Sequence, residues 1–430
     1  MRNQWCFRVA TVVIMMAGGP VGVVEGETGS DATIEEQTRV DALCRQAQPV
    51  AAALFGVPEG GPVPVVVRSR AEVRDYLLEV MDREYPNREL QRRSSCFAEI
   101  GLVPRGYDLA GGLAAAVDQA AGGLYDPHSK VFISISDLSE ELKSAPYQRL
   151  IAGHELTHAL QDRKVDLVAR GLEVLEDLDA GYGFVAVVEG TAMVVGMAHM
   201  QNVALDEMSE LAAVLRAGFE AQYSGDSTLA DAPPYLRERL IGPYVDGSAF
   251  VQMFLNRNPG RPLASLFDDL PVSAEQVLHY EKYVEGDEPT PVDLRPMDDL
   301  RPEAWRLIYT NTLGEFELRT LFASHAATRD DAVSTAAGWD GFRLAAYGTD
   351  DGTVIVAGAS VWDSVEDASE FSAAFAKVLA GLHARGSYEI RTVGNRVGFV
   401  TGVSEDNDRS TFLDALVERP EPGGETDVPS

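Results

Sequence analysis

The feature that constrains this chain most is a pair of histidines four residues apart. His154 and His158 stand in the segment HELTH, inside a pattern that predicts a helix over 147–163. Residues four apart lie on one face of a helix, so the two imidazoles can bind a single metal ion. Glu155 lies beside that face, where a base for a metal-activated water is needed. The sequence therefore predicts two metal ligands, His154 and His158, and a catalytic glutamate, Glu155.

A catalytic metal site needs a further ligand, and Glu189 is the candidate. It is the one carboxylate of the apolar segment 184–195, within a helix predicted over 180–200. A helix that is apolar on nearly all sides is buried, and a buried carboxylate without a partner is costly. Two histidines and one glutamate are the ligand set of many catalytic zinc sites. A buried salt bridge is the alternative role for Glu189. The small residues Gly190 and Ala192 predict that this helix packs closely on the helix of the two histidines.

These two segments resemble the gluzincin zinc metallopeptidases, the thermolysin-like group in its broad sense. The resemblance rests on HELTHALQD at 154–162 and VEGTA at 188–192, and it is closest to exported bacterial proteins of that group. It implies that His154, His158 and Glu189 bind Zn²⁺ and that Glu155 is the general base. It also implies that the strand predicted over 130–136 is a sheet edge along which a peptide lies.

One position departs from the gluzincin pattern. Many gluzincins carry an acidic residue four positions after the glutamate ligand, where it supports a ligand histidine, but this chain has Met193. Asp162 and Asp179 are the two substitutes that the sequence offers. Because residues that support a metal ligand commonly change metal affinity or activity about 10–100-fold, the replacement bears on function.

Peptide hydrolysis also needs a hydrogen-bond donor for the oxyanion in addition to the metal. His279 and Tyr244 are the catalytic candidates for this role, and Tyr283 is a third. The segments 243–247 and 273–279 resemble recurring segments of gluzincins. A purely structural role is the alternative for each of the three residues.

The predicted elements, together with the resemblance, indicate an α+β fold. Its expected centre is a gluzincin-like zinc-peptidase core with a small mixed sheet and two zinc-site helices. Two strands, a helix and two further strands form an expected ββαββ domain near the C-terminus. The expected divisions are a signal peptide over 1–26, a zincin-like metallopeptidase domain over 27–335 with its zinc core at 123–203 and a mainly helical part at 204–335, a small α/β domain over 336–405, and a C-terminal segment over 406–430 that ends in a disordered tail.

The charge and the two ends of the chain narrow the function. With 67 acidic and 36 basic residues the formal charge is -31, which argues against nucleic acid as a partner. Residues 1–26 have a positive start, a short apolar core and small residues, as is typical of a secretory signal. We therefore expect an exported protein, periplasmic, cell-surface or extracellular, without a membrane segment in its mature form. In such a compartment Cys44 and Cys96 either form one disulfide or remain buried free thiols.

The sequence thus favours an exported zinc-dependent peptidase, an endopeptidase, that acts on a peptide or protein substrate. Glu155 would serve as general base toward the metal-activated water. The alternative is a catalytically inactive zinc-binding structural or interaction protein of the same fold. The intact Glu155 favours the enzyme, and Met193 favours the alternative. The oligomeric state does not follow from the sequence.

Overall fold

The computed structural model describes residues 30–84, 88–113, 122–174, 177–208, 210–223, 231–294, 300–325, 328–384, 387–403 and 409–417. The expected signal peptide over 1–26 and the tail after residue 417 lie outside the described residues. The described chain is an α+β fold with two small sheets. It divides into two compact units. Unit 1 comprises Met1–Gln91 and Asp108–Asp287, and unit 2 comprises Arg92–Tyr107 and Glu288–Ser430.

The sheet of unit 1 has three strands, β1 (Val65–Arg68), β2 (Gly123–Asp126) and β3 (Val131–Ile135), in the order β1-β3-β2. β1 runs parallel to β3 and β2 runs antiparallel to it, so the sheet is mixed, as predicted. β3 has a partner on both sides. The expectation that the strand over 130–136 forms a sheet edge is therefore wrong, and among the described strands the edges are β1 and β2.

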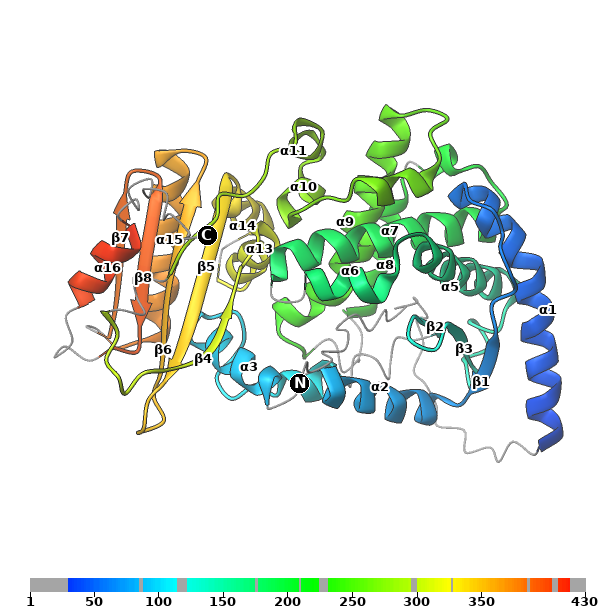
Figure 1. Cartoon of the computed structure of the whole chain (residues 1–430), viewed down its shortest axis with the longest axis horizontal. Coiled ribbons are helices and arrows are strands. Elements are labelled where there is room, and N and C mark those ends of the chain that lie inside the picture. Colours follow the sequence, from blue (N-terminus) through cyan, green and yellow to red (C-terminus); the bar gives the residue numbers. More distant parts are fainter. Residues whose placement is uncertain are drawn as a thin grey trace, which may run out of the picture. The chain divides into compact units, whose positions relative to one another are not determined.

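Helices make up most of unit 1 (Figure 1). The apolar helix α7 lies between the histidine helix α5 and the helix α9, with which it makes its main contacts. The helices are α1 (Ser30–Phe55), α2 (Arg70–Glu84), α5 (Ala145–Val165), α6 (Leu167–Glu173), α7 (Leu178–Gln201), α8 (Leu211–Tyr223), α9 (Pro234–Arg257), α10 (Ala274–Leu278) and α11 (Tyr280–Glu285), with short 3₁₀-helices at Leu205–Glu207 and Leu263–Asp268. Helix α3 (Glu89–Ile100) crosses the division between the units.

Glycines allow α7 to approach its two neighbours closely. A Cβ atom built on Gly153 of α5 would lie 3.1 Å from the Cα atom of Gly196 on α7. A Cβ atom built on Gly190 would lie 2.2 Å from the backbone carbonyl carbon of Gly247 on α9. The expectation that Gly190 packs on the histidine helix is therefore wrong. Gly196 makes that contact, and Gly190 makes the contact with α9.

Among the described residues, α7 is the one helix long and apolar enough to cross a membrane by length and composition. Most of its apolar stretch is buried inside the protein. Its first turn is capped by Asp177, whose side chain accepts hydrogen bonds from the backbone N–H groups of Asp179 and Ala180. Burial on both sides and a capped start are what a core helix requires.

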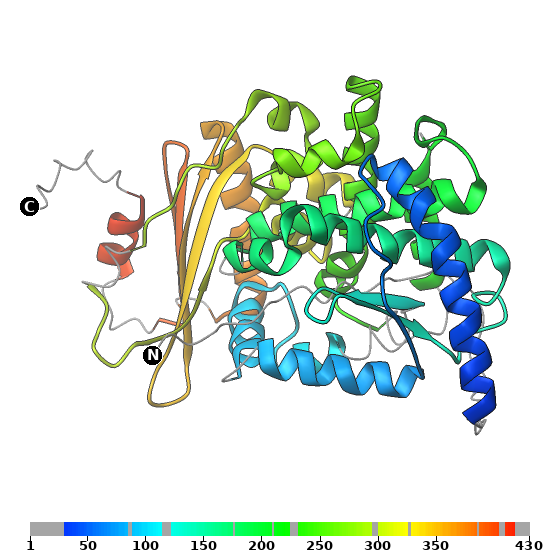
Figure 2. The same cartoon turned by 45° about the vertical axis from the view of Figure 1, so that its right-hand side comes forward.

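Unit 2 contains a five-stranded antiparallel sheet in the order β4-β5-β6-β8-β7 (Figure 2). The predicted ββαββ order is present as β5, β6, α15, β7 and β8. The strands are β4 (Arg306–Asn311), β5 (Trp339–Gly348), β6 (Val354–Trp362), β7 (Tyr388–Val393) and β8 (Arg396–Thr401), and the helices are α13 (Glu315–Ala323), α14 (Arg329–Ala336), α15 (Val365–Leu382) and α16 (Arg409–Val417). The part over 204–335 is mainly helical, as predicted, but it also contains the strand β4, which the sequence does not predict and which pairs with β5. The structure divides the chain between 287 and 288, whereas the sequence analysis places the boundary at 335.

Alternation along β5 gives the unit 2 sheet two apolar faces. Phe342 packs against Phe371 of α15 on one face. Tyr347 lies an odd number of residues after Phe342, so its side chain is on the other face, where it packs against Trp305. Phe412 of α16 also contacts Trp305 on that face. Because both faces are covered, the sheet is the centre of the unit 2 core.

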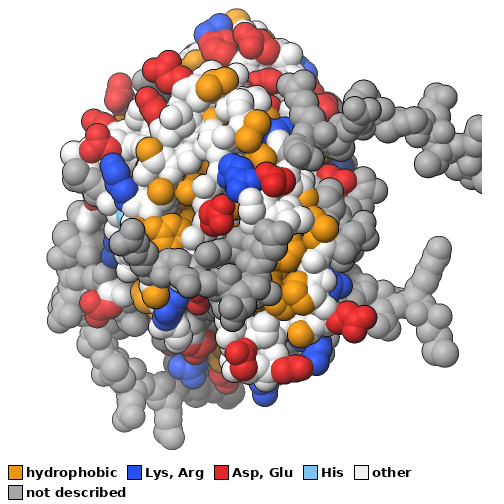
Figure 3. Space-filling model, turned by 90° about the vertical axis from the view of Figure 1, so that its left-hand side faces the viewer, with side chains coloured by type: hydrophobic (Ala, Val, Ile, Leu, Met, Phe, Trp, Pro, Cys, Tyr) orange, Lys and Arg blue, Asp and Glu red, His pale blue; other side chains and the backbone are white. Residues whose placement is uncertain are grey.

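One face of the molecule is drawn in Figure 3, where acidic, basic and apolar side chains are intermingled. Exposed apolar residues of unit 2 include Leu307, Val365 and Val393. Single apolar side chains at a surface are ordinary and need no partner. We therefore assign no binding surface to this face.

Cys44 and Cys96 are both buried and both free thiols. Burial raises the pKa of Cys44 to about 12 and also raises the pKa of Cys96 above its usual value. Of the two states that the sequence leaves open, the structure has the free thiols.

Candidate metal centre

The structure brings together the three predicted metal ligands and the predicted base. His154, Glu155 and His158 lie on α5, and Glu189 lies on α7. The first three are 0% exposed and Glu189 is 2% exposed. The pairing of α5 with α7 through Gly153 and Gly196 sets these side chains against one another in the core of unit 1.

Three ligand atoms converge. His154 Nε2 lies 2.9 Å from His158 Nε2, and Glu189 Oε2 lies 3.3 Å from the former and 3.6 Å from the latter. In a tetrahedral zinc site with bonds of 2.0–2.1 Å, neighbouring ligand atoms are about 3.3 Å apart. The three separations bracket that value. His154, His158 and Glu189 thus have the spacing that one small divalent cation requires.

Unsatisfied atoms at the centre point to the same conclusion. Glu189 Oε2 is buried and accepts no hydrogen bond within the described part of the chain. The two Nε2 atoms face each other at a distance at which one of them must lack a proton. Buried polar atoms without partners are rare in proteins and need an explanation. The two imidazoles and the carboxylate therefore fit a metal ion by donor type, burial and spacing.

The charges of the centre are coupled. Burial alone would raise the pKa of Glu189, but the neighbouring His158 and the contacts with both imidazoles outweigh burial and lower that pKa to about 2. Burial opposes the charge of His158 as well, and the carboxylate of Glu189 raises the pKa of that imidazole. The His158–Glu189 pair therefore favours its ionised form inside the core.

The other two groups shift toward their neutral forms. Burial, assisted by the charge of His158, lowers the pKa of His154 to about 4. Burial raises the pKa of Glu155 to about 8. His154 thus offers a neutral Nε2 lone pair, which is the form that binds a metal.

Gln161 supports His158 and is a site residue that the sequence analysis does not identify. Its Oε1 atom lies 2.8 Å from His158 Nδ1, and its amide nitrogen donates to Val188 O at 2.9 Å. Gln161 therefore fixes the His158 ring and ties it to α7 one residue before Glu189. The sequence does indicate this contact, because Gln161 stands three residues after His158 and residues three apart on a helix are neighbours.

His154 has no such support among the described residues. Its Nδ1 atom is buried and has no hydrogen-bond partner. The buried Met193, which stands where many gluzincins have an acid, supplies no polar atom suited to this ring nitrogen. The two proposed substitutes bond elsewhere. Asp162 accepts from Tyr125 Oη, Lys130 Nζ and Leu167 N, and Asp179 accepts from Ala274 N.

The carboxylate of Glu155 is held by the sheet. Its Oε2 atom accepts a hydrogen bond from the backbone N–H of Tyr125 on β2, at 2.6 Å. Its Oε1 atom is buried and has no hydrogen-bond partner among the described residues. One oxygen of Glu155 is thus fixed, and the other is available for a proton.

The three candidate oxyanion donors lie in different surroundings in the structure. The ring of Tyr244 stacks on that of His154, with centroids 6.1 Å apart and an interplanar angle of 29°. His279 ends α10, where its backbone N–H donates to Glu275 O at 2.8 Å. Tyr283 donates its hydroxyl to Asp269 O at 2.8 Å and packs on Phe250. Tyr244 therefore has a ring contact with the centre.

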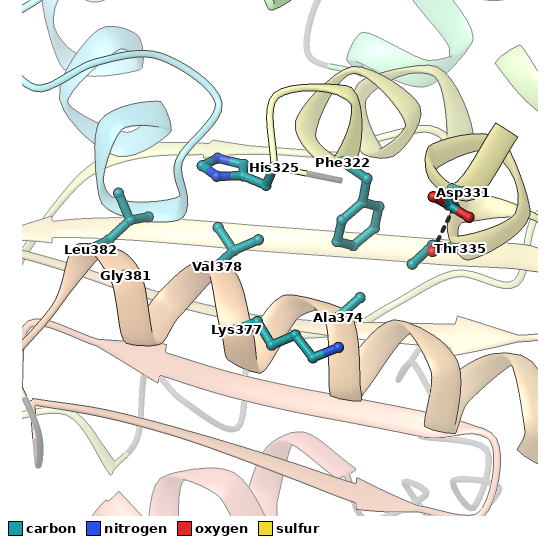
Figure 4. A pocket seen from close by; sticks show the side chains of 9 residues that line it. All are labelled: Phe322, His325, Asp331, Thr335, Ala374, Lys377, Val378, Gly381 and Leu382. Carbon is teal, nitrogen blue, oxygen red and sulfur yellow. Dashed lines mark hydrogen bonds between the residues drawn. The ribbon is translucent and has the colours of Figure 1, made fainter. Parts of the chain in front are cut away.

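A cavity of about 470 Å³ lies in unit 2, between α13, α14 and α15. Figure 4 shows Phe322 and His325 facing Val378 and Leu382 of α15, with the Asp331–Thr335 hydrogen bond at one side. His325 Nε2 is already 3.1 Å from Gly101 O. The cavity shares no residue with the metal centre.

Comparison with known proteins covers unit 2 alone. Residues 306–419 match the model of a family described as a domain of unknown function (DUF8575). This range contains β4–β8 and α13–α16 and does not reach α5 or α7. No curated protein and no solved structure matches the chain.

Proposed function

We propose that this protein is a zinc-dependent peptidase of the gluzincin type. The observation that carries the proposal is the convergence of His154 Nε2, His158 Nε2 and Glu189 Oε2, which lie within 4.8 Å of one another in a buried centre beside Glu155. A structural metal site needs His154, His158 and Glu189, but it does not need a second carboxylate, that of Glu155, whose Oε1 has no hydrogen-bond partner among the described residues.

The residues of the chain have distinct roles in the proposed reaction. A Zn²⁺ ion bound by His154, His158 and Glu189 would polarise the scissile carbonyl and lower the pKa of water to about 7. Glu155 Oε1 takes one proton from the water as its oxygen attacks the carbonyl carbon. Glu155 then gives this proton to the amide nitrogen as the C–N bond breaks, which yields a carboxylic acid and an amine. Tyr244, whose ring stacks on that of His154, would supply the donor for the developing oxyanion.

The peptide substrate would lie along an edge strand near Glu155. β3 is central, so we propose the edge strand β2 for this role, because it is the strand that reaches Glu155; its Tyr125 N–H stays on Glu155, and the peptide would pair with other main-chain groups of β2. Pairing of a peptide with a sheet edge uses main-chain hydrogen bonds and accepts many side chains. We propose that the enzyme is an endopeptidase of exported proteins or peptides, acting in the periplasm, at the cell surface or outside the cell.

A second candidate function is that of a zinc-binding structural or interaction protein without activity. Two observations favour it. The four central residues are almost completely inaccessible, and His154 Nδ1 has no hydrogen-bond partner in the described part of the chain. A metal held in this way would stabilise the packing of α5 on α7 and nothing more.

One experiment separates the two functions. Protein purified without added metal is analysed for zinc by mass spectrometry and incubated with fluorescein-labelled casein. The peptidase is expected to contain about one zinc per chain, and Glu155→Gln is expected to retain the zinc while losing about 100-fold or more of the hydrolysis rate. Glu275→Gln is the matched control, because Glu275 is also a buried acid of unit 1 but pairs with Lys282. If wild type and Glu155→Gln both contain zinc and neither cleaves casein or a peptide library, the peptidase function is contradicted and the structural role remains.

A further inference from the structure

Tyr125 makes two contacts with α5, at points two helical turns apart. Its backbone N–H donates to Glu155 Oε2 at 2.6 Å, and its hydroxyl donates to Asp162 Oδ2 at 2.7 Å. Residues 155 and 162 lie about 10.5 Å apart along the helix axis and on nearly the same face. Two anchors at this separation fix both the position and the direction of β2 along the helix.

The anchor at Asp162 is strong and shielded. Asp162 accepts hydrogen bonds from Tyr125 Oη at 2.7 Å, from Lys130 Nζ at 2.7 Å and from the backbone N–H of Leu167 at 3.0 Å. The side chain of Asp162 is 2% exposed, whereas that of Lys130 is 53% exposed and covers it from the solvent side. Hydrogen bonds to a charged acceptor are about twice as strong as neutral ones, so this cluster holds the phenol firmly.

The β2–β3 turn places Lys130 for this contact. Lys130 has a positive φ of 59°, and its backbone N–H donates to Asp126 O at 2.8 Å. The Asp126 carboxylate accepts from the backbone N–H groups of His128 and Ser129 inside the same turn. The turn is therefore rigid, and its geometry sends the ammonium group of Lys130 to α5 rather than into solvent.

The anchor at Glu155 is the one that matters for chemistry. Among the described residues, Tyr125 N–H is the single hydrogen-bond donor to the Glu155 carboxylate, since Oε1 has none. A carboxylate held by one oxygen keeps the other in a defined direction. Without this hold the side chain would rotate, and either oxygen would face the metal-binding atoms.

We infer that Tyr125 is a positioning residue, whose phenol, held by Asp162 and Lys130, keeps its own backbone N–H on Glu155 Oε2 and so presents Oε1 to the reacting water. The consequence for turnover rests on the proposed peptidase function. The positioning itself does not, because it concerns contacts of the chain that exist without substrate.

The first test measures the contact between Tyr125 and Glu155 and does not depend on enzymatic activity. Residue-resolved amide hydrogen exchange is measured at position 125 in wild type, Tyr125→Phe and Lys130→Gln. The amide points away from β3, so its protection depends on Glu155, and we expect exchange at least ~10-fold faster in both variants. Tyr147→Phe is the matched control, because Tyr147 also pairs its hydroxyl with an acid of unit 1, Glu141. Unchanged exchange at position 125 in Tyr125→Phe and Lys130→Gln would overturn the inference.

The second test measures the effect of this contact on turnover. In Tyr125→Phe we expect kcat to fall about 5–20-fold with KM and zinc content unchanged, and Tyr147→Phe to match wild type. The double variant Tyr125→Phe with Asp162→Asn should be no slower than the slower single variant, because both remove the same anchor. A change in melting temperature without a change in kcat would show that Tyr125 is merely structural. If wild type cleaves nothing, the proposed function fails, and the exchange measurement alone decides on the positioning.

Discussion

Gly190 of α7 and Gly247 of α9 touch through their backbones. A Cβ atom on Gly190 would lie 2.2 Å from the Gly247 carbonyl carbon, and a Cβ atom on Gly247 would lie 1.9 Å from Ala186 O. Neither position has room for a side chain, and Glu189 is the immediate neighbour of Gly190.

Gly190→Ala and Gly247→Ala are therefore expected to lower the free energy of unfolding by about 2–3 kcal/mol each, as overpacked cores do. They should also weaken metal binding, because α7 must shift. Gly181→Ala is the control on the same helix. Its Cβ atom would have an ordinary contact at 3.5 Å, and alanine there should stabilise α7 by about 0.5–1 kcal/mol. Urea denaturation measures the free energy of unfolding of all three variants. Equal effects at positions 181 and 190 would contradict the close contact between Gly190 and Gly247.

Metal binding should stabilise the fold through His154, His158 and Glu189. At a free zinc concentration 100 times the dissociation constant, the stabilisation is about 2.7 kcal/mol. We expect zinc to raise the melting temperature of the chelator-treated wild type but not that of His154→Ala or Glu189→Gln. Differential scanning calorimetry with and without zinc makes the comparison. The same rise in the variants would remove these residues from the ligand set.

Loss of the Gln161 amide should release the His158 ring. We expect Gln161→Ala to weaken zinc binding about 10-fold or more in a chelator competition assay, as for other residues that support a ligand. Gln148→Ala is the control, because Gln148 is a buried glutamine of the same helix that bonds to Leu142 O. It should lower stability and leave zinc affinity as in wild type.

Met193→Asp would return an acid to the position one helical turn after Glu189. Because His154 Nδ1 is buried without a partner among the described residues, a carboxylate on this face of α7 would have a donor to accept from. We expect tighter zinc binding and a less stable metal-free form, since burial of a charge is costly without the cation. Met193→Leu separates the charge from the change of side-chain shape. Zinc affinity equal in the two variants would count against this explanation.

Cys44 and Cys96 should react slowly in the native protein. Burial raises the pKa of Cys44 to about 12, so at pH 8 the thiol is protonated. We expect iodoacetamide to label neither residue until the chain is unfolded, as measured by peptide mass mapping. The raised pKa also favours the folded state fully below pH ~8.5, the usual thiol pKa, and this contribution is lost as pH rises above it. Rapid labelling of native Cys44 would show that the site is open.

Local patterns in the sequence were sufficient to predict the elements whose structure depends on neighbouring residues. The strands over 388–393 and 396–401 occur with the predicted bounds, because the Gly394 turn with its φ of 59° joins two alternating segments. The spacing of His154 and His158 placed both imidazoles on one face of α5. Glu189 was found because an acid in an apolar helix needs a partner.

What the sequence did not reveal depends on contacts between distant segments. The central place of β3 follows from its pairing with β1, more than 60 residues earlier in the chain. β4 has the sequence RLIYTN, a run without alternation and too short to be distinguished from a helical stretch, and its pairing with β5 decides its structure. The hold of Tyr125 on Glu155 uses a backbone N–H, which no side-chain pattern can indicate.

The double glycine contact of α7 has a consequence for ion selectivity. With Gly196 against α5 and Gly190 against α9, the helix cannot slide or retreat to widen the space beside Glu189. Calcium needs bonds of about 2.3–2.6 Å and six to eight oxygen atoms. If the proposed site binds a metal, we therefore expect it to exclude calcium, because close packing at two residues without side chains keeps the space beside Glu189 small.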